Sequence, residues 1–367
     1  MLTKRMQVTY QPHQLVGSIT PWNAQLAMQM LDIPAALMAG CAVLTKASEV
    51  TPLGWNLAIQ GWKAMGAPDV LDAVTGRGEA GAAVVEAVDM VQFTGSVGTG
   101  RRIGIRAAER MIPCSLELGG KDAMIVLADA DLDRAARAAV WGGFDNAGQI
   151  CVSVERVYVE APVYDEFVAK VIEHTNALRL GTDSPGSFET DIGAIATPEQ
   201  LAIIERHVAD AVTRGASVAA GGKAVPGAGL YYEPTVLLNV DESMQCMSEE
   251  TFGPTLPIVK VADADEAVRR ANDSQFGLAA SIFTRDHAKG RLLATRIDAG
   301  SVNVNNVMTN VFQLSVPSAV AANRGWALDT ELPTAFASTV GANPSSRSGS
   351  TCPPRSTGIQ RKRATSS

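Results

Sequence analysis

The chain has 367 residues, of which 46% are hydrophobic and 19% charged, and this balance predicts a folded protein of two domains and excludes disorder for most of its length. A net charge of −7 argues against general affinity for nucleic acid or anionic membranes. No apolar run reaches the ~18 residues that cross a bilayer, and residues 1–10 contain none long enough for a signal peptide. We therefore expect a cytoplasmic protein whose partners are small molecules.

Short apolar runs alternate with helical patterns from Pro21 to about Asn306, which is typical of an α/β fold built on mostly parallel sheets. Strands are expected at Cys41–Thr45, Met90–Phe93, Ala123–Leu127, Arg156–Val159, Leu256–Val261 and Val302–Asn305. Helices are expected at Asp131–Trp141, which starts with a capping-type aspartate, and at Glu199–Arg214, which is amphipathic. The apolar stripe of the second helix would consist of Leu201, Ile204, Val208 and Val212.

The alternation divides the chain into two α/β units, residues 13–119 and residues 120–317. Ligand sites favour the cleft between two such units, so the junction near residue 119 is the expected place for an active centre. From Gly341 onward Ser, Pro, Thr, Gly and Arg predominate and acidic residues are missing. That composition predicts a disordered tail. A basic tail that binds nucleic acid is the alternative, but it would be expected to interleave aromatic residues.

The five cysteines are an odd number without any Cys-x-x-Cys pair, so neither a disulfide framework nor a metal site is expected. Four of them fit the ordinary interpretation of a small buried hydrophobe, namely Cys41, Cys114, Cys246 and Cys352. Cys151 differs because Gly148 and Gln149 precede it, and glycine lets the backbone bring the sulfur and its own N–H close to a substrate. We interpret Cys151 as a nucleophile that needs a base or a lowered pKa to ionise.

Two further residues can work with this cysteine. Glu117 follows an apolar strand-like run and precedes Gly119 and Gly120, so its carboxylate can lie at a strand end facing a cleft. Alone it would be read as a surface glutamate in a salt bridge, but beside Cys151 a general base that activates water for thioester hydrolysis is the better interpretation. Asn23 offers an amide that could complete an oxyanion hole with the cysteine N–H, and a turn-forming asparagine is the alternative.

Two loops are suited to a dinucleotide. Phe93–Gly100 follows a strand and opens a helix expected at Arg101–Arg110, so its N–H groups and the helix dipole could bind a pyrophosphate. A plain strand-to-helix turn is the alternative. Lys46–Glu49 places a cation and a carboxylate at the carboxyl end of a strand, a place suited to ribose hydroxyls, and a solvated charged loop is the alternative.

Six segments in this order resemble the aldehyde dehydrogenase superfamily over about residues 16–317, and they look most like its succinate-semialdehyde dehydrogenases. The segments are Ile19–Asn23, Lys46–Glu49, Phe93–Ser96, Glu117–Lys121, Gly148–Cys151 and Glu249–Pro254. The resemblance implies a Rossmann-type NAD(P)-binding domain beside an α/β catalytic domain. It also implies oxidation of an aldehyde to the carboxylic acid through a thiohemiacetal and a thioester on cysteine.

The resemblance assigns a role to each matching residue. Cys151 would be the nucleophile, Glu117 the general base and Asn23 the oxyanion donor. The cofactor contacts would be Lys46 and Glu49 at the adenosine ribose, Gly95 and Ser96 at the pyrophosphate, Glu250 at the nicotinamide ribose and Phe252 at the nicotinamide face. Ser48 would tolerate a 2′-phosphate, whereas the Glu49 carboxylate would repel it, which favours NAD over NADP.

The chain departs from the family pattern at both ends. Residues 1–12 would be the remnant of an oligomerisation hairpin and residues 13–119 a partial dinucleotide-binding domain, while residues 318–367 match none of the family's remaining sequence. The homo-oligomer usual in the family is therefore doubtful for this chain. Two alternative functions stay open: a truncated remnant without catalytic activity, and a cofactor-independent thioesterase or esterase that uses Cys151 and Glu117.

Overall fold

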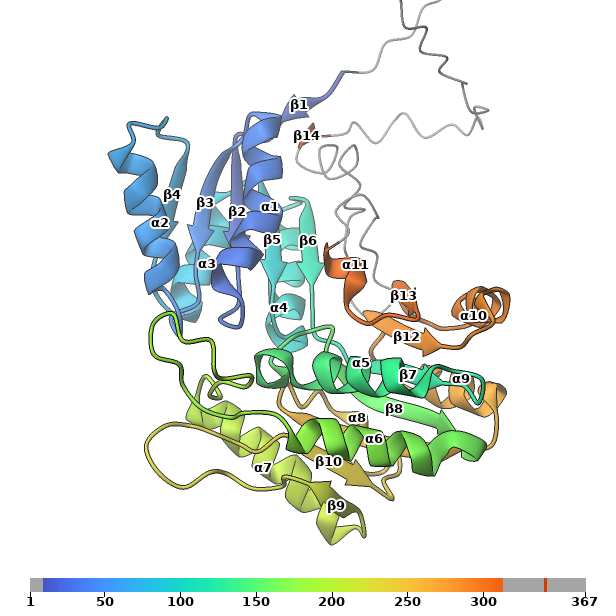
Figure 1. The fold of residues 1–367 in the computed structure, drawn as a ribbon. Coiled ribbons are helices and arrows are strands. Elements are labelled where there is room, and N and C mark those ends of the chain that lie inside the picture. The colour runs from blue at the N-terminus through green and yellow to red at the C-terminus, as the bar shows by residue number, and fades with distance from the viewer. Residues whose placement is uncertain (1–8, 313–339, 342–367) are drawn as a thin grey trace, which may run out of the picture.

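The computed structural model describes residues 9–312 and 340–341, and two large sheets with helices packed on them make up most of it (Figure 1). Strand β1, Gln11–Pro12, pairs antiparallel with β14, Val340–Gly341. Residues 1–8 of the hairpin expected at residues 1–12, and all of the tail expected at residues 318–367 except Val340–Gly341, lie outside the described residues. In the part that is described, no helix is long and apolar enough to span a membrane.

The first sheet is parallel and five-stranded, with the order β4-β3-β2-β5-β6. Its strands are β2 Leu15–Ile19, β3 Ala42–Lys46, β4 Leu71–Val74, β5 Met90–Thr94 and β6 Cys114–Glu117. Helices α1 Gln25–Ala39 and α2 Leu53–Ala64 share one apolar cluster with the sheet, and α3 Gly78–Ala87 and α4 Val97–Glu109 share another. The two separate clusters fit a parallel sheet that is covered on both faces.

Helix α4 begins at Val97, about one turn before the expected start at Arg101. The reason is that Ser96 is its N-cap, and the Ser96 Oγ accepts a hydrogen bond from the Thr99 N–H at 3.4 Å. A serine in this position satisfies one of the unpaired N–H groups of the first turn. The earlier start places Ser96 at the positive end of the helix dipole.

The second sheet has seven strands in the order β13-β12-β7-β8-β11-β10-β9, and only the β9-β10 pair is antiparallel. Its strands are β7 Asp122–Val126, β8 Val154–Glu160, β9 Ser217–Ala220, β10 Thr235–Leu238, β11 Thr255–Val261, β12 Ala279–Phe283 and β13 Ser301–Val304. The helices around it are α5 Leu132–Phe144, α6 Tyr164–Asn176, α7 Pro198–Thr213, α8 Gln245–Ser248, α9 Ala264–Asn272, α10 His287–Ala294 and α11 Thr309–Phe312, with short 3₁₀ turns at Asp145–Gly148 and Ala161–Val163.

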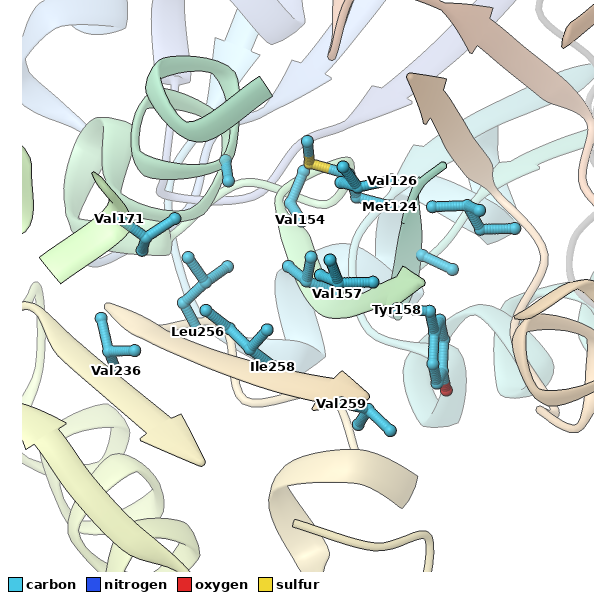
Figure 2. Packing of buried hydrophobic residues seen from close by; sticks show 14 of the residues in the cluster. Met124, Val126, Val154, Val157, Tyr158, Val171, Val236, Leu256, Ile258 and Val259 are labelled. Atoms are coloured by element: carbon cyan, nitrogen blue, oxygen red, sulfur yellow. The ribbon is translucent and has the colours of Figure 1, made fainter. Parts of the chain in front are cut away.

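All six expected strands are confirmed, with small shifts at their ends. Strand β8 is buried along its whole length, as expected for a central parallel strand with both faces covered. Figure 2 shows Val157 of this strand packed near Leu256 and Ile258 of the neighbouring β11. The seven-stranded sheet and its helices therefore share one continuous core.

The two expected helices in this part are confirmed, with one correction. Asp131 caps α5 by accepting a hydrogen bond from the Arg134 N–H at 3.1 Å. The apolar stripe predicted for α7 is wrong at its last member. Val212 is 47% exposed, while its neighbour Ala211 is buried. Position 211 follows Ile204 by two helical turns and so shares its face, whereas position 212 is rotated toward solvent.

Candidate active site

The two sheets are joined by residues 118–121, and the glycine pair in this segment permits an unusually close approach of three chain segments. A Cβ atom on Gly119 would lie 2.2 Å from the Glu250 Oε2, and one on Gly120 would lie 2.2 Å from the Cys151 carbonyl oxygen. A side chain at position 120 would clash with the Cys151 backbone, and one at position 119 would displace the Glu250 carboxylate. The glycines therefore bring the strand that ends at Glu117 together with Cys151 and Glu250.

The cysteine follows a turn of left-handed backbone. After α5, Asn146, Ala147 and Gly148 have φ values of 49°, 57° and 70°. At Gly148 a Cβ would lie 2.2 Å from the Gly253 carbonyl oxygen, so glycine is required by packing against the Glu249–Pro254 loop. The turn reverses the chain and leaves Cys151 half-buried.

The buried Gln149 side chain fixes this turn. Its Nε2 donates to the Asn146 carbonyl at 2.9 Å, and its Oε1 accepts from the Ala196 N–H at 2.9 Å. The main-chain carbonyl of Gln149 accepts a hydrogen bond from the Asn23 Nδ2 at 2.9 Å. Asn23 is thereby held beside the cysteine turn, with the second N–H of its amide unused by this bond.

A cavity of about 260 Å³ brings together six of the predicted site residues. They are Asn23, Gly95, Ser96, Cys151, Glu250 and Phe252. Sequence reasoning missed three other residues of its lining, namely Met28, Gln200 and Ile203. We call this space the catalytic cavity.

A second cavity, of about 700 Å³, adjoins the first and contains the other predicted cofactor residues. Lys46, Ser48 and Glu49 line it, together with Arg77 and Arg102, which were not predicted. The two cavities share Pro21, Trp22, Thr94, Gly95 and Ser96. We call this larger space the nucleotide cavity, because its wall includes the N-terminus of α4 and several cations, which suit an anionic ligand.

Glu117 lines neither cavity wall, yet it lies close enough to act on the cysteine electrostatically. Burial is the main cause that raises the pKa of Cys151 to about 12, and the charges of Asp122, Glu117 and Glu250 add to the rise. A thiol so weakly acidic is a poor nucleophile at neutral pH. Cys151 therefore needs a base or a nearby positive charge before it can attack a carbonyl.

The glutamates near the cysteine have raised pKa values of their own. Burial, with repulsion from Asp32 on α1, raises the pKa of Glu117 to about 8. Burial followed by repulsion from Glu155 raises the pKa of Glu250 to about 8. Asp32, which sequence reasoning missed, has its pKa raised to about 7 by burial. Carboxyl groups whose pKa lies near neutral pH are characteristic of sites that transfer protons.

These shifts predict how stability varies with pH. Each raised carboxyl pKa means that the folded chain binds more protons than the unfolded chain between the ordinary value of 4.5 and about 8. The stabilising effect is full below the unfolded pKa and is lost as the pH rises through the folded pKa. We expect a lower melting temperature at about pH 9 than at about pH 6, and a smaller difference for Glu117→Gln. A melting temperature that does not change between these pH values would contradict the raised pKa values.

The Glu249–Pro254 loop presents its side chains to both the glycine pair and Trp22. The Gly120 N–H donates to the Glu250 Oε1 at 3.0 Å. Phe252, with a left-handed φ of 50°, makes an edge-to-face contact with Trp22, with ring centroids 5.4 Å apart. The aromatic pair and Glu250 thus lie on the wall of the catalytic cavity.

Lys46 and Glu49 meet in the nucleotide cavity, where the Lys46 Nζ lies 2.8 Å from the Glu49 Oε2. Burial alone would raise the pKa of Glu49, but the hydrogen bond from Lys46 and the charge of Arg77 outweigh it and lower the pKa. Glu49 therefore stays ionised at neutral pH. Among the described residues, no group of three or more metal-ligating side chains is found.

Known proteins resemble this chain in sequence and in fold. A model described as "Aldehyde dehydrogenase family" matches residues 2–318. The "Putative succinate-semialdehyde dehydrogenase (NADP+) 2" of Mycobacterium ulcerans is 43% identical over 301 residues, which are 81% of this chain and 58% of that protein. The chain therefore spans less than two thirds of the length of this relative.

Solved structures agree with the family match. The lactaldehyde dehydrogenase of Escherichia coli has a TM-score of 0.87 at 34% identity, covering 92% of this chain and 70% of that one. A Mycobacterium tuberculosis aldehyde dehydrogenase complexed with NAD+ has a TM-score of 0.86 at 35% identity, covering 92% of this chain and 69% of that one. The α/β fold expected from the six motifs is confirmed, and this chain belongs to the aldehyde dehydrogenase family.

Proposed function

We propose that this chain oxidises an aldehyde to the carboxylic acid with NAD(P), through a thioester on Cys151. The observation that supports this most is that two cavities share part of their lining. One contains Cys151, Asn23, Glu250 and Phe252, and the other is lined by Lys46 and has room for a nucleotide. The five-stranded unit would hold the cofactor and the seven-stranded unit would supply the nucleophile.

Each of the catalytic residues has its own role in the proposed reaction. Cys151 loses its thiol proton to solvent water, and the thiolate adds to the aldehyde carbon. The developing oxyanion would receive hydrogen bonds from the Cys151 N–H and the unused N–H of Asn23. Bound NAD(P) supplies an acceptor for the hydride that leaves this carbon. Glu117, with a pKa of about 8, then takes a proton from water as the water attacks the thioester. Release of the acid restores the Cys151 thiol.

The residues present fit a dinucleotide. Ser96 lies at the N-terminus of α4 on the wall common to both cavities, where backbone N–H groups and the helix dipole favour a pyrophosphate. Lys46 and Glu49 offer a cation and a carboxylate to ribose hydroxyls in the nucleotide cavity. A pyrophosphate at Ser96 would place the two ends of the cofactor in the two cavities.

The test of this proposal is the formation of NADH from NAD and a small aldehyde by the purified chain, together with cooperative unfolding at a temperature that rises with NAD. Both results would exclude the alternative of a non-catalytic remnant. Ester hydrolysis without any NADH formation would instead support the cofactor-independent esterase and overturn the proposal.

Asn23→Ala is expected to lower turnover roughly 10²–10³-fold, the usual cost of removing one oxyanion donor. Because Asn23 also bonds the Gln149 carbonyl, its melting temperature must be measured alongside the rate. Asn272→Ala, which loses a surface bond to the Arg296 carbonyl and lines neither cavity, is the matched control and should turn over normally. A folded Asn23→Ala protein with an unchanged rate would remove Asn23 from the oxyanion hole.

NAD is the proposed cofactor in preference to NADP, because the ionised Glu49 in the nucleotide cavity would repel a 2′-phosphate. Glu49→Gln should therefore raise the ratio of kcat/KM for NADP to that for NAD by roughly 10-fold, or about 1.4 kcal/mol. Glu199→Gln, at an exposed site outside both cavity linings, should leave the ratio unchanged. If Glu49→Gln leaves it unchanged too, another residue discriminates between the cofactors.

Succinate semialdehyde is the substrate named for the Mycobacterium ulcerans relative, and we propose it as the first aldehyde to test. Its carboxylate calls for a cation, and the lining of the catalytic cavity includes no lysine or arginine among the described residues. Butanal, which has the same chain length without the charge, is the matched comparison. A higher kcat/KM for succinate semialdehyde than for butanal would support the proposal, and the reverse order would overturn it.

A further inference from the structure

The buried Glu155 and the partly buried Gln200 hydrogen-bond the N–H and carbonyl groups of Thr251 and Phe252. From β8, the Glu155 carboxylate accepts the Thr251 N–H at 2.8 Å and the Phe252 N–H at 2.8 Å. From α7, the Gln200 Nε2 donates to the carbonyl of Thr251 at 2.8 Å and to that of Phe252 at 3.1 Å. Side chains thus satisfy the peptide groups of this segment. In a sheet, a neighbouring strand would do so. Phe252 is held in its left-handed conformation by these bonds.

Glu155 also pairs with a lysine from the segment that joins the two sheets. The Lys121 Nζ lies 2.5 Å from the Glu155 Oε2, and the two side chains are only 1% and 3% exposed. Lys121 also donates to the Thr251 Oγ1 at 3.3 Å. Since Gly120, the preceding residue, bonds Glu250, the ion pair connects the Glu117–Lys121 segment to the loop of Glu250 and Phe252.

The placement of this carboxylate is poorly explained by stability alone. A buried ion pair contributes little net stability, because the loss of hydration offsets the attraction between the charges, and apolar residues of the same size often do as well. Apolar residues could not, however, accept the two N–H groups that Glu155 accepts. What the pair supplies is a fixed position for the two residues that line the catalytic cavity, Glu250 and Phe252.

We propose that Glu155 is a positioning residue for the cofactor step, which fixes Glu250 and Phe252 against the catalytic cavity without touching any ligand itself. This inference rests on the proposed function. Hydride transfer requires the donor carbon and the acceptor ring to be aligned, and misplacement by about 1 Å can cost roughly 10²-fold in rate. Attack of the Cys151 sulfur on an activated ester needs no such alignment. Loss of Glu155 should therefore affect the two reactions differently.

The experiment compares Glu155→Gln with the unmodified chain in two reactions. One is NADH formation from butanal, and the other is hydrolysis of p-nitrophenyl acetate, which uses Cys151 and Glu117 but no cofactor. We expect the KM for NAD to rise roughly 10-fold or more, kcat for oxidation to fall, and a deuterium isotope effect from 1-deuterated butanal to appear or increase, since alignment for hydride transfer is lost. Ester hydrolysis should stay within about two-fold.

Glu160→Gln is the matched control, since it makes the same substitution in a buried glutamate of the same strand. Glu160 accepts the Ala128 N–H at 2.6 Å and lines neither cavity, so both reactions should be unaffected. If Glu155→Gln does not fold because Lys121 is left as an unpaired buried charge, the double variant Lys121→Met with Glu155→Gln removes that charge. The double variant should then show the same selective loss.

The outcomes separate the inference from the proposed function. Equal losses of oxidation and ester hydrolysis, or an unchanged KM for NAD, would overturn the positioning role of Glu155. So would failure of both variants to fold, because it would assign Glu155 to stability. Failure of the unmodified chain to form NADH while it hydrolyses the ester would instead overturn the proposed function.

Discussion

Replacing Cys151 by serine is expected to lower NADH formation from an aldehyde by roughly 10⁴-fold or more, the scale of loss seen when a covalent nucleophile is removed. A serine hydroxyl is far less acidic than a thiol, and the burial and nearby carboxyl groups that raise the pKa of Cys151 to about 12 would also oppose ionisation of the serine. Steady-state NADH absorbance measures the rate, and bound NAD can be measured separately to show that the site remains intact.

Cys114→Ser is the appropriate control for this substitution. Cys114 is a half-buried cysteine on β6 that lines neither cavity, so its replacement should leave turnover within about two-fold. Residual NADH formation by Cys151→Ser near the original rate would show that oxidation does not pass through a thioester at this position.

Glu117→Gln is expected to slow steady-state turnover roughly 10²–10⁴-fold, the usual contribution of a general base, while leaving the first turnover nearly intact. Glutamine preserves the shape of the side chain but cannot take a proton from water. The thioester would therefore accumulate, and rapid mixing should show a burst of up to about one NADH per chain followed by a slow phase.

The burst distinguishes two roles for this carboxyl group. If Glu117 is the general base for the water that attacks the thioester, only the rate of the slow phase falls. If the first turnover slows as much as the steady state, Glu117 acts on the Cys151 thiol instead, and its assignment to thioester hydrolysis is wrong. The pH dependence offers a second measure, because the steady-state turnover of the unmodified chain should accelerate as the pH rises toward the Glu117 pKa of about 8.

Much of the fold and part of the site could be predicted because their signals are local in sequence. The cap at Asp131 and the apolar run of β8 lie within the elements they define. The glycine pair before Lys121 and the Gly148 turn each signal a close approach that no side chain could allow. These signals do not identify the residue that comes close. In the structure Gly119 lies against Glu250, and Gly148 lies against Gly253.

The residues that were missed depend on contacts between distant parts of the chain. Glu155 meets Thr251 across 96 residues, and Gln200 meets the same residue across 51. Each looks locally like an ordinary strand or helix residue. Asp32 is similar, because nothing near it in α1 indicates that its charge faces Glu117. Periodicity also failed at Val212, where a single-residue shift changes which face of a helix a side chain occupies.

Covalent catalysis by Cys151 is tested most directly by the mass of the Cys151 peptide from Glu117→Gln after mixing with butanal and NAD. We expect an acyl group on Cys151, equal to butanal less two hydrogens, together with a matching amount of NADH. No adduct without NAD, or with Cys151→Ser, should be found. An acyl adduct at another residue, or NADH formed without any adduct, would contradict covalent catalysis by this cysteine.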